Sequence, residues 1–275
     1  MYNILTLNAI SPKGLAKLPP EEFKVSSDFE NPDGIIVRSA DMHDYNIPES
    51  LLCIARAGAG TNNIPVEKCA EKGVVVFNTP GANANAVKEL VLAALLISSR
   101  KITEAAEWTK TLKGQPDMDK LVEGGKKKFA GPEITGKKLG VIGLGAIGVL
   151  VANAALALGM EVIGFDPFLS VHSAWHISGQ VELAKSVEEV VTQGDYVTIH
   201  VPQNDSTKNM INTELLKKFK TGARLINLAR GGLVDPAAVA AALDEGILSK
   251  YVTDFAAEEL LGKENVITLP HLGAS

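Results

Sequence analysis

An uncharged stretch from Leu139 to Met160 constrains the fold of this chain more than any other feature of its sequence. A helix of that length could cross a bilayer. Glycines, however, occupy positions 140, 143, 145 and 148, within the first ten positions of the stretch. A buried parallel strand followed by a tight turn and a buried helix requires the same apolar composition. We therefore expect a strand–turn–helix unit inside an α/β domain rather than a membrane span.

The turn of this unit has the sequence Gly143-Leu144-Gly145-Ala146-Ile147-Gly148, which is a G-x-G-x-x-G motif. It follows an expected strand over 138–142 and opens an expected helix over 147–158, the context that dinucleotide-binding turns require. The first glycine permits the tight turn, the second lets the backbone approach a pyrophosphate, and the third allows close packing of helix on strand. The helix N-terminus offers free N–H groups to the phosphates. The motif therefore predicts a dinucleotide site.

Asp166 ends the next expected strand, 166 − 148 = 18 residues after the last glycine of the motif. A carboxylate at this place can accept hydrogen bonds from an adenosine ribose, and it would repel a 2′-phosphate. The alternative is that Asp166 only begins a turn before Pro167. With the whole unit present, we expect NAD rather than NADP as the cofactor.

The composition does not resemble that of a protein that binds nucleic acid or a membrane surface. The 27 basic and 32 acidic residues give a net charge of −5, and aromatic residues make up 5% of the chain. No basic field would attract DNA or an anionic bilayer, and few rings could stack on bases. Two cysteines, Cys53 and Cys69, are too few for a disulfide framework, and the first residues lack the basic segment of a signal peptide. We expect a cytoplasmic protein with reduced thiols.

Short apolar segments bounded by turn residues alternate with helical segments, which predicts parallel α/β sheets. The expected strands are residues 4–7, 34–37, 51–55 and 74–77 in the first part of the chain, and 139–143, 161–166, 196–201, 224–228, 251–254 and 266–269 in the second. One helix is expected over 65–73, and another begins after the capping residue Asp235 and ends at Gly246. We expect two doubly wound parallel-sheet domains, over 1–82 and 83–272, with ligands beyond the carboxyl ends of the strands.

Two segments between the expected sheets differ in character. Residues 83–99 form an expected helix that is apolar on every face from Leu90 to Ile97, so it should be buried on all sides, against both domains or a partner subunit. Residues 110–136 contain several glycines and prolines, which predicts a long mobile loop. The run Lys126-Lys127-Lys128 within it is interpreted as a solvated face, with anion binding as the alternative.

Charged side chains follow the last three expected strands. Arg230 comes after the first of them, a group of carboxylates over 254–259 after the second, and His271 after the third. Because the carboxyl ends of parallel strands meet at one edge of a sheet, these residues should lie beside the dinucleotide. Together they suit hydride transfer from a hydroxy acid, with the histidine as the base. Each residue alone could instead be a surface arginine, a solvated glutamate pair or a capping histidine.

Two other classes of dehydrogenase do not fit the sequence. The short-chain class needs Tyr-x-x-x-Lys, and no tyrosine has a lysine four residues later. The zinc alcohol dehydrogenases need more thiolates than two cysteines supply. His172 and His176 have a spacing that could bind a metal ion on a helix, but no third ligand is near them in sequence. We expect no metal ion.

The chain resembles the NAD-dependent D-isomer-specific 2-hydroxyacid dehydrogenases over essentially its whole length and, within that family, the phosphoglycerate dehydrogenases. The motifs that carry the resemblance are Arg38-Ser39-Ala40, Arg56-Ala57-Gly58-Ala59-Gly60-Thr61-Asn62-Asn63-Ile64, Asn78-Thr79-Pro80, Lys128-Phe129-Ala130-Gly131, the glycine-rich turn, His200-Val201-Pro202, Ala229-Arg230-Gly231-Gly232 and Pro270-His271-Leu272-Gly273-Ala274-Ser275. The resemblance implies a flavodoxin-like substrate domain over 1–82, a Rossmann NAD-binding domain over 83–272, and a cleft between them.

The resemblance also implies roles for individual residues. The catalytic residues would be Arg230, Glu259 and His271. The cofactor-binding residues would be Gly143, Gly145, Ala146, Ile147, Gly148, Asp166, His200, Pro202, Ala229, Asp254 and Gly273. The substrate-binding residues would be Arg38, Ser39, Arg56, Ala57, Gly58 and Lys128, whose cations would hold the additional negative charge of a phosphorylated acid. For the arginines, capping or surface ion pairs are the structural alternative.

The implied function is the oxidation of 3-phospho-D-glycerate to 3-phosphohydroxypyruvate with NAD. The apolar faces of helix 83–99 lead us to expect a homodimer formed through that helix. The alternatives are a glycerate, hydroxypyruvate or D-lactate type of dehydrogenase in the same family, and an NAD-sensing binding protein. The sequence departs from the family in two places. It stops at Ser275, where relatives continue with a helix that returns to the first domain, and its loop over 260–270 is short. We therefore expect a trimmed chain whose site lacks its full lid.

Overall fold

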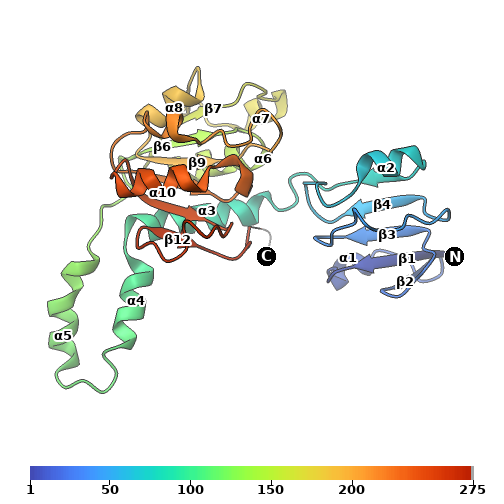
Figure 1. Cartoon of the computed structure of the whole chain (residues 1–275), viewed down its shortest axis with the longest axis horizontal. Helices are drawn as coiled ribbons and strands as arrows, with labels where there is room; N and C mark the ends of the chain where they lie inside the picture. The colour runs from blue at the N-terminus through green and yellow to red at the C-terminus, as the bar shows by residue number, and fades with distance from the viewer. Residues whose placement is uncertain (274–275) are drawn as a thin grey trace. The chain divides into compact units, whose positions relative to one another are not determined.

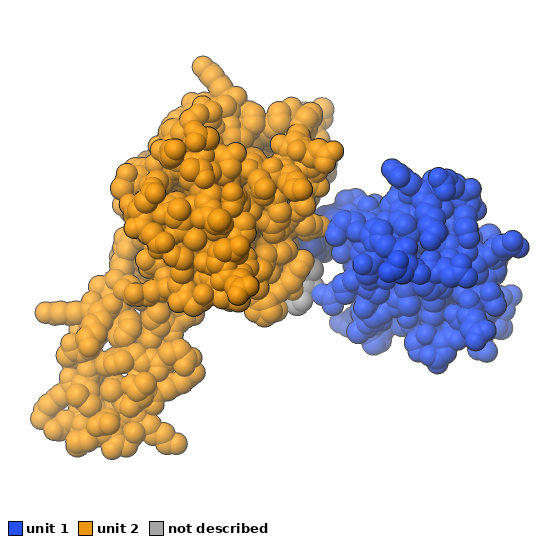
Figure 2. All heavy atoms as spheres, viewed as in Figure 1, with its two compact units in different colours: residues 1–83 blue, residues 84–275 orange. Residues whose placement is uncertain are grey.

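The computed structural model describes residues 1–273 and divides the chain into two compact units, Met1–Asn83 and Ala84–Ser275 (Figure 1, Figure 2). Each unit contains one parallel sheet and its own hydrophobic core. The boundary follows Asn83, where the sequence places the start of the apolar helix. The last two residues of the motif that ends the sequence, Ala274 and Ser275, lie outside the described residues.

The first unit is a five-stranded parallel sheet in the order β2-β1-β3-β4-β5, which is the flavodoxin-like order. Its strands are β1 (Tyr2–Leu7), β2 (Phe23–Ser26), β3 (Gly34–Val37), β4 (Cys53–Arg56) and β5 (Val75–Phe77), and its helices are α1 (Pro12–Leu15) and α2 (Val66–Glu71). All the expected strands are present. The edge strand β2 was not expected, because a short segment with a lysine in it carries too weak an apolar pattern to be told from a loop.

The second unit is a seven-stranded parallel sheet in the order β12-β11-β10-β9-β6-β7-β8, which contains the Rossmann arrangement. Its strands are β6 (Lys138–Ile142), β7 (Glu161–Phe165), β8 (Glu182–Leu183), β9 (Tyr196–Ile199), β10 (Ala223–Asn227), β11 (Leu248–Thr253) and β12 (Val266–Thr268). The predicted fold class of two parallel-sheet domains is confirmed. The uncharged stretch forms β6, a turn and a buried helix, and no helix within residues 1–273 is long and apolar enough to span a bilayer.

Helices of the second unit pack on both faces of this sheet. The helices of the unit are α3 (Ala84–Ser99), α4 (Ile102–Lys110), α5 (Met118–Gly125), η1 (Lys126–Phe129), α6 (Ala146–Ala157), α7 (Val171–His176), α8 (Val187–Gln193), α9 (Thr213–Leu216), η2 (Gly231–Leu233) and α10 (Pro236–Asp244). Side chains of α3 and α6 pack in one core cluster, and those of α8, α9 and α10 pack in the other. Successive residues of a strand point to opposite faces, so β6 contributes Val141 to the first cluster and Ile142 to the second.

Helix α3 is buried on one side only within the single chain. Val91, Ala94 and Leu95 are fully buried against the sheet, whereas Leu96 keeps 44% of its surface exposed. The expectation of burial on all sides is therefore not met by residues 1–273 alone. The exposed side remains available for contact with a second molecule.

The prediction of a long mobile loop over 110–136 is wrong. The central part of the segment, residues 118–129, forms α5 and η1, which pair with α4 as a helical hairpin that projects from the second unit (Figure 1). The ring of Trp108 packs in a tilted orientation against that of Phe129, with 5.2 Å between centroids, and a Cβ at Gly125 would lie 2.3 Å from that indole. Gly125, which suggested a loop, has no side chain, and the indole of Trp108 occupies the space that a side chain there would need. The lysines 126–128 are exposed, as their interpretation as a solvated face requires.

A largely buried ion pair fastens this hairpin to the sheet. Lys250 on β11 donates a hydrogen bond to Glu104 on α4 at 2.6 Å, and the lysine side chain is only 8% exposed. Burial raises the pKa of Glu104, but the hydrogen bond and charge of Lys250, together with hydrogen bonds from the Glu104 backbone and Thr103, outweigh that effect and leave the pKa below its ordinary value. Because the folded-state pKa is lowered, this stabilisation is present at neutral pH and is lost as the pH falls through that pKa.

Replacing Glu104 with alanine should lower the free energy of unfolding by about 3 kcal/mol, because it leaves the Lys250 ammonium buried without a counter-charge. Urea denaturation measures the change. Glu107→Ala is the matched control on the same helix, since the ion pair of Glu107 with Lys110 is exposed and should contribute less than ~1 kcal/mol. Equal losses in the two variants would contradict the proposed role of the buried pair.

Candidate active site

The order of the second sheet brings the candidate residues to one edge. The glycine-rich turn follows β6, Asp166 follows β7, His200 follows β9, Arg230 follows β10, Asp254 follows β11, and His271 follows β12. All these strands are parallel, so their carboxyl ends lie on the same side of the sheet. In sheets of this kind ligands bind beyond that edge. The imidazole of His271 therefore lies at the same edge as the glycine-rich turn.

The three glycines of the turn occupy three different environments. Gly143 has φ +95°, and a Cβ there would lie 2.8 Å from the carbonyl oxygen of His200. A Cβ at Gly148 would lie 1.9 Å from the carbonyl oxygen of Gly143, so only glycine permits this approach of α6 to the turn. A Cβ at Gly145 would have no atom within 4 Å. The open space at Gly145 is what the close approach of a ligand to the backbone requires.

Helix α6 begins directly after Gly145, and no side chain caps its first N–H groups. Ala146 and Ile147 form its first turn. The first backbone N–H groups of a helix have no partner within it, and the helix dipole favours negative charge at this end. The turn therefore fits the diphosphate of a dinucleotide.

The carboxylate of Asp166 is held in place by two backbone N–H groups. Leu144 donates to one oxygen and Phe168 to the other, both at 2.8 Å. A carboxylate oxygen can accept more than one hydrogen bond, so each retains capacity for a ribose hydroxyl. The first of these bonds also connects the carboxylate directly to the glycine-rich turn.

The imidazole of His200 is shielded from water, and the backbone of His200 lies beside the glycine-rich turn. Its Nε2 lies 3.0 Å from the hydroxyl of Thr198, and its Nδ1 is buried without a hydrogen-bond partner among residues 1–273. Burial of the ring lowers the pKa of His200 to about 3, so the ring is neutral at physiological pH. Pro202, two residues later, is exposed. His200 thus presents a neutral ring with an unsatisfied nitrogen.

Asp254 is the most unusual group at this edge. It is 3% exposed, and neither carboxylate oxygen has a partner of good hydrogen-bond geometry among residues 1–273. Burial raises its pKa, while the charge of His271, the approach of the Gly273 backbone N–H and the charge of Arg230 act in the opposite direction. A Cβ at Gly273 would lie 3.6 Å from the Asp254 carboxylate. A buried acceptor without a donor is the expected signature of a group that awaits a ligand.

Arg230 and His271 lie on either side of Asp254 in strand order. Nη1 of Arg230 donates to the carbonyl of Ala229 at 2.6 Å, and the backbone carbonyl of Arg230 accepts a bond from Asn227. His271 is exposed, and its ring meets that of Phe255 edge-on at 5.0 Å. The structure therefore brings Arg230, Asp254 and His271 together.

The structure does not bring Glu259 to His271. Glu259 is exposed, and no ion pair joins its carboxylate to the imidazole within the described part of the chain. Glu259 lies in the connection between β11 and β12, whereas Asp254 lies at its start. The acidic group that acts electrostatically with His271 in this structure is Asp254.

The candidate substrate residues of the first unit lie at the carboxyl edge of its own sheet. Arg38 directly follows β3 and Arg56 ends β4, and Val37 is paired in register with Arg56. The backbone N–H of Ser39 donates to the side chain of Asn8 at 2.9 Å. Ala57 donates its backbone N–H to Val37 at 2.7 Å. These bonds fix the two turns that carry the arginines.

Gly58 holds the guanidinium of Arg56 close to the backbone. A Cβ at Gly58 would lie 1.6 Å from Nη1 of Arg56, so any other residue there would displace the arginine. The φ angle of Gly58 is +150°, which also favours glycine.

The remaining candidate substrate residue, Lys128, lies on η1 of the second unit and is exposed.

The histidine pair His172 and His176 does not form a metal site in this structure. Both lie on α7 with ring centroids 4.3 Å apart, but Nδ1 of His176 bonds to the carbonyl of His172. Among residues 1–273, no group of three or more His, Cys, Asp or Glu side chains is arranged to hold a metal ion.

The NAD-binding-domain model of the D-isomer specific 2-hydroxyacid dehydrogenases matches residues 92–273. The chain belongs to this family. Curated relatives include the D-3-phosphoglycerate dehydrogenase of Methanocaldococcus jannaschii, with 38% identity over 90% of this chain and 47% of that protein. The hydroxypyruvate reductase of Thermotoga maritima is also 38% identical, over 88% of this chain and 78% of that protein. The chain spans about half the length of the phosphoglycerate dehydrogenases it matches.

Solved structures of the same family resemble the whole fold. The holo form of D-mandelate dehydrogenase from Rhodotorula graminis matches with a TM-score of 0.83 and 25% identity, over 99% of this chain and 88% of that one. Family membership and the fit of the glycine-rich turn together establish a nicotinamide dinucleotide as the cofactor of the second unit.

Sequence reasoning missed the residues that position the family motifs. Asn8 caps the turn at Ser39, Thr198 contacts the ring of His200, and Asn227 bonds to the backbone of Arg230. Thr198 and Asn227 lie within strands read only as apolar segments. A polar side chain near the carboxyl end of a buried strand is the signal that could have found them, because a buried polar group needs a partner.

Proposed function

We propose that the chain is the catalytic part of an NAD-dependent dehydrogenase that oxidises 3-phospho-D-glycerate to 3-phosphohydroxypyruvate, the entry to serine synthesis. The observation that carries the proposal is the grouping of Arg230, Asp254 and His271 at the sheet edge that also holds the glycine-rich turn. Curated relatives at 34–38% identity that bear the name phosphoglycerate dehydrogenase support the substrate.

The second unit would bind the cofactor through residues described above. The N–H groups at Gly145, Ala146 and Ile147 would bind the diphosphate, with Gly143 and Gly148 shaping the turn. Asp166 would accept from the adenosine ribose and favours NAD over NADP. Asp254 would accept from the nicotinamide carboxamide, with Ala229 and Gly273 beside it, and His200 and Pro202 would complete the site. When bound, NAD supplies the acceptor for the hydride.

The side chains at the edge would carry out the remaining chemistry. Oxidation removes a hydride from the carbon and a proton from the hydroxyl of the substrate. His271 would take the proton, a contribution of about 10²–10⁴ in rate. Arg230 would bind the substrate carboxylate through charge-assisted hydrogen bonds. Glu259 would orient His271, which requires the connection between β11 and β12 to bring its carboxylate closer than it lies here.

The phosphate of the substrate would be bound by the first unit. Arg38 and Arg56, with the turn residues Ser39, Ala57 and Gly58, present cations at one sheet edge, and Lys128 would add a further charge. Arg38→Ala should therefore raise KM for 3-phospho-D-glycerate by about 10-fold or more, the value of one charge-assisted contact, while KM for D-glycerate changes little. Steady-state kinetics with both acids measure this. Equal effects on both acids would remove Arg38 from the phosphate site.

Comparative turnover tests the function itself. The rate of NADH formation, or of its consumption in the reverse direction, is measured with phosphorylated and unphosphorylated hydroxy and keto acids, and with NAD and NADP. The proposal expects the highest kcat/KM with 3-phospho-D-glycerate and NAD. A preference for D-glycerate and hydroxypyruvate would support the second candidate, a hydroxypyruvate reductase, which the Thermotoga relative favours because the chain covers 78% of it. Affinity for NAD without turnover would indicate an NAD-sensing protein.

The dehydrogenase is proposed to be a homodimer through helix 83–99. The exposed side of α3 and the projecting hairpin carry apolar side chains in contact with water, among them Leu96, Ile102, Met118 and Leu121. Light scattering should give the mass of a dimer, and Leu96→Glu with Ile102→Glu should give a monomer because buried carboxylates would oppose association. A monomer mass of the unmodified chain at every concentration would refute the dimer.

We also assign the enzyme to the cytoplasm, without nucleic-acid or membrane partners. Cys53 and Cys69 are free thiols, which agrees with a reducing compartment.

A further inference from the structure

A pocket lies at the amino end of the seven-stranded sheet, at the opposite end of the strands from the glycine-rich turn. Pro132, Lys137, Asp195 and the turn over 220–224 line it. Its volume of about 200 Å³ is smaller than the ~300–1,000 Å³ of pockets that hold drug-sized ligands. The pocket can therefore accept a small ion or the headgroup of a larger ligand.

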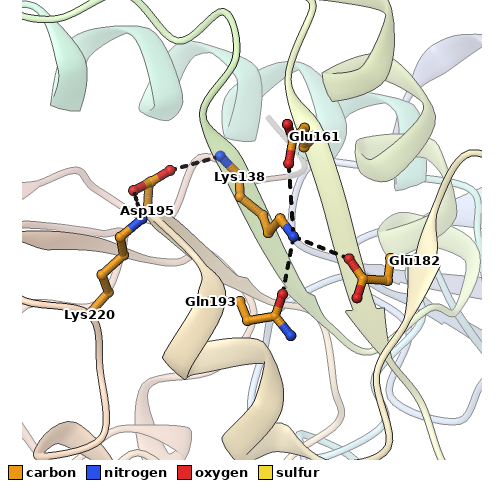
Figure 3. A network of polar contacts seen from close by, with 6 residues as sticks. All are labelled: Lys138, Glu161, Glu182, Gln193, Asp195 and Lys220. Carbon is orange, nitrogen blue, oxygen red and sulfur yellow. Dashed lines mark hydrogen bonds and ion pairs between the residues drawn. The ribbon is translucent and has the colours of Figure 1, made fainter.

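The charge of this pocket is positive. Lys137, Lys220 and Arg224 line it together with a single carboxylate, Asp195. That carboxylate already has two donors, the backbone N–H of Lys138 at 2.9 Å and the ammonium of Lys220 at 2.6 Å (Figure 3). The ammonium of Lys138 bonds instead to Glu182 and Gln193 (Figure 3). Three cations against one satisfied anion leave an excess of positive charge.

Two of the cations keep donors for a ligand. Nε of Arg224 donates to the carbonyl of Ser98 at 3.0 Å, and its guanidinium lies over the ring of Tyr196 at 4.9 Å, so the side chain is held in place. Within residues 1–273, no acceptor binds the terminal nitrogens of Arg224 or the ammonium of Lys137. A pre-positioned guanidinium with a lysine nearby is an arrangement that recognises phosphate.

We propose that this pocket binds a small phosphate-bearing anion, at a site separate from the dinucleotide edge. Lys137 and Gly143 flank the two ends of β6 and lie 143 − 137 = 6 residues apart, which at ~3.3 Å per residue is about 20 Å. No diphosphate held at the turn could also occupy the pocket. The proposal concerns binding alone, so it does not depend on which hydroxy acid the enzyme oxidises.

A titration of the whole chain with inorganic phosphate, followed by backbone amide NMR, tests the site. The amides of Thr221, Gly222 and Arg224 should shift and saturate together. The double variant Lys137→Gln/Arg224→Gln should weaken the affinity read at Thr221 and Gly222 by about 10-fold or more. Lys113→Gln/Lys217→Gln is the matched control, since it removes the same charge at exposed positions outside the pocket.

Three outcomes would overturn the site: shifts confined to the glycine-rich turn over 143–148, no saturable shift at all, or equal weakening in both double variants. If Arg224→Gln does not fold, Lys137→Gln alone decides, because Lys137 is exposed and its replacement leaves the packing unchanged. A parallel titration with glycerol 3-phosphate tells whether the pocket prefers a phosphomonoester or free phosphate. If glycerol 3-phosphate binds as tightly as inorganic phosphate or more tightly, the ligand of the pocket is a phosphomonoester. If only inorganic phosphate binds, the ligand is the free ion.

Discussion

Replacing His271 with asparagine should lower kcat/KM for the preferred hydroxy acid by about 10²–10⁴-fold, because asparagine cannot accept the hydroxyl proton. Affinity for NADH, followed by its fluorescence, should change little, since the cofactor contacts proposed above come from other residues. The structure supports the assignment because His271 lies at the same sheet edge as the glycine-rich turn and acts electrostatically on Asp254.

His176→Asn is the control for this substitution. His176 is exposed on α7, and among residues 1–273 its ring nitrogens bond only to the backbone carbonyl of His172, so its replacement should leave turnover unchanged. Turnover of His271→Asn within a factor of three of the unmodified enzyme would exclude the imidazole as the base. Glu259→Gln adds a further comparison: a loss well below that of His271→Asn would agree with the exposed position of Glu259.

Gly145→Ala and Gly148→Ala each add one methyl group, but the first should lower the affinity for NAD and the second should lower the stability of the fold. The new methyl at Gly148 would meet a carbonyl oxygen at 1.9 Å, so α6 must shift, and we expect a loss of about 3 kcal/mol in the free energy of unfolding. The new methyl at Gly145 meets no atom of the described chain, so stability should be unchanged. Its affinity for NAD should nevertheless fall by about 5- to 150-fold, the equivalent of ~1–3 kcal/mol of overpacking against the ligand.

Urea denaturation and NADH titration of both variants separate these effects. Normal NADH affinity in a stable Gly145→Ala variant would show that the dinucleotide does not approach the backbone at this place. Normal stability of Gly148→Ala would show that the packing of α6 on the turn is looser than the structure indicates.

Local sequence predicts the sheets of this chain well, because their residues form apolar runs with turn residues at both ends. The span of β3 is as expected, and α10 begins where Asp235 caps it, with its carboxylate accepting from Ala237 and Ala238. The glycine-rich turn is also recognisable from the sequence, because its three glycines recur at a fixed spacing between a strand and a helix.

The hairpin and the details of the edge could not be predicted in this way. Gly125 suggested a loop because the ring that fills the space beside it belongs to Trp108, on another helix. The position of the Asp254 carboxylate beside Gly273 joins two residues that are distant in sequence. The separation of Glu259 from His271 depends on the path of a whole connection. Such contacts exist only after the chain has folded.

The position of His271 after β12 has a consequence for how the enzyme would lose activity. Strand β12 is only three residues long and pairs with β11 alone among the described strands, whereas β6 lies in the middle of the sheet. Edge segments with few neighbours open at a lower free-energy cost than the centre of a domain. The imidazole of His271, which we propose as the proton acceptor, would thus detach by local fraying while the glycine-rich turn remains intact, and heat inactivation would precede melting of the protein.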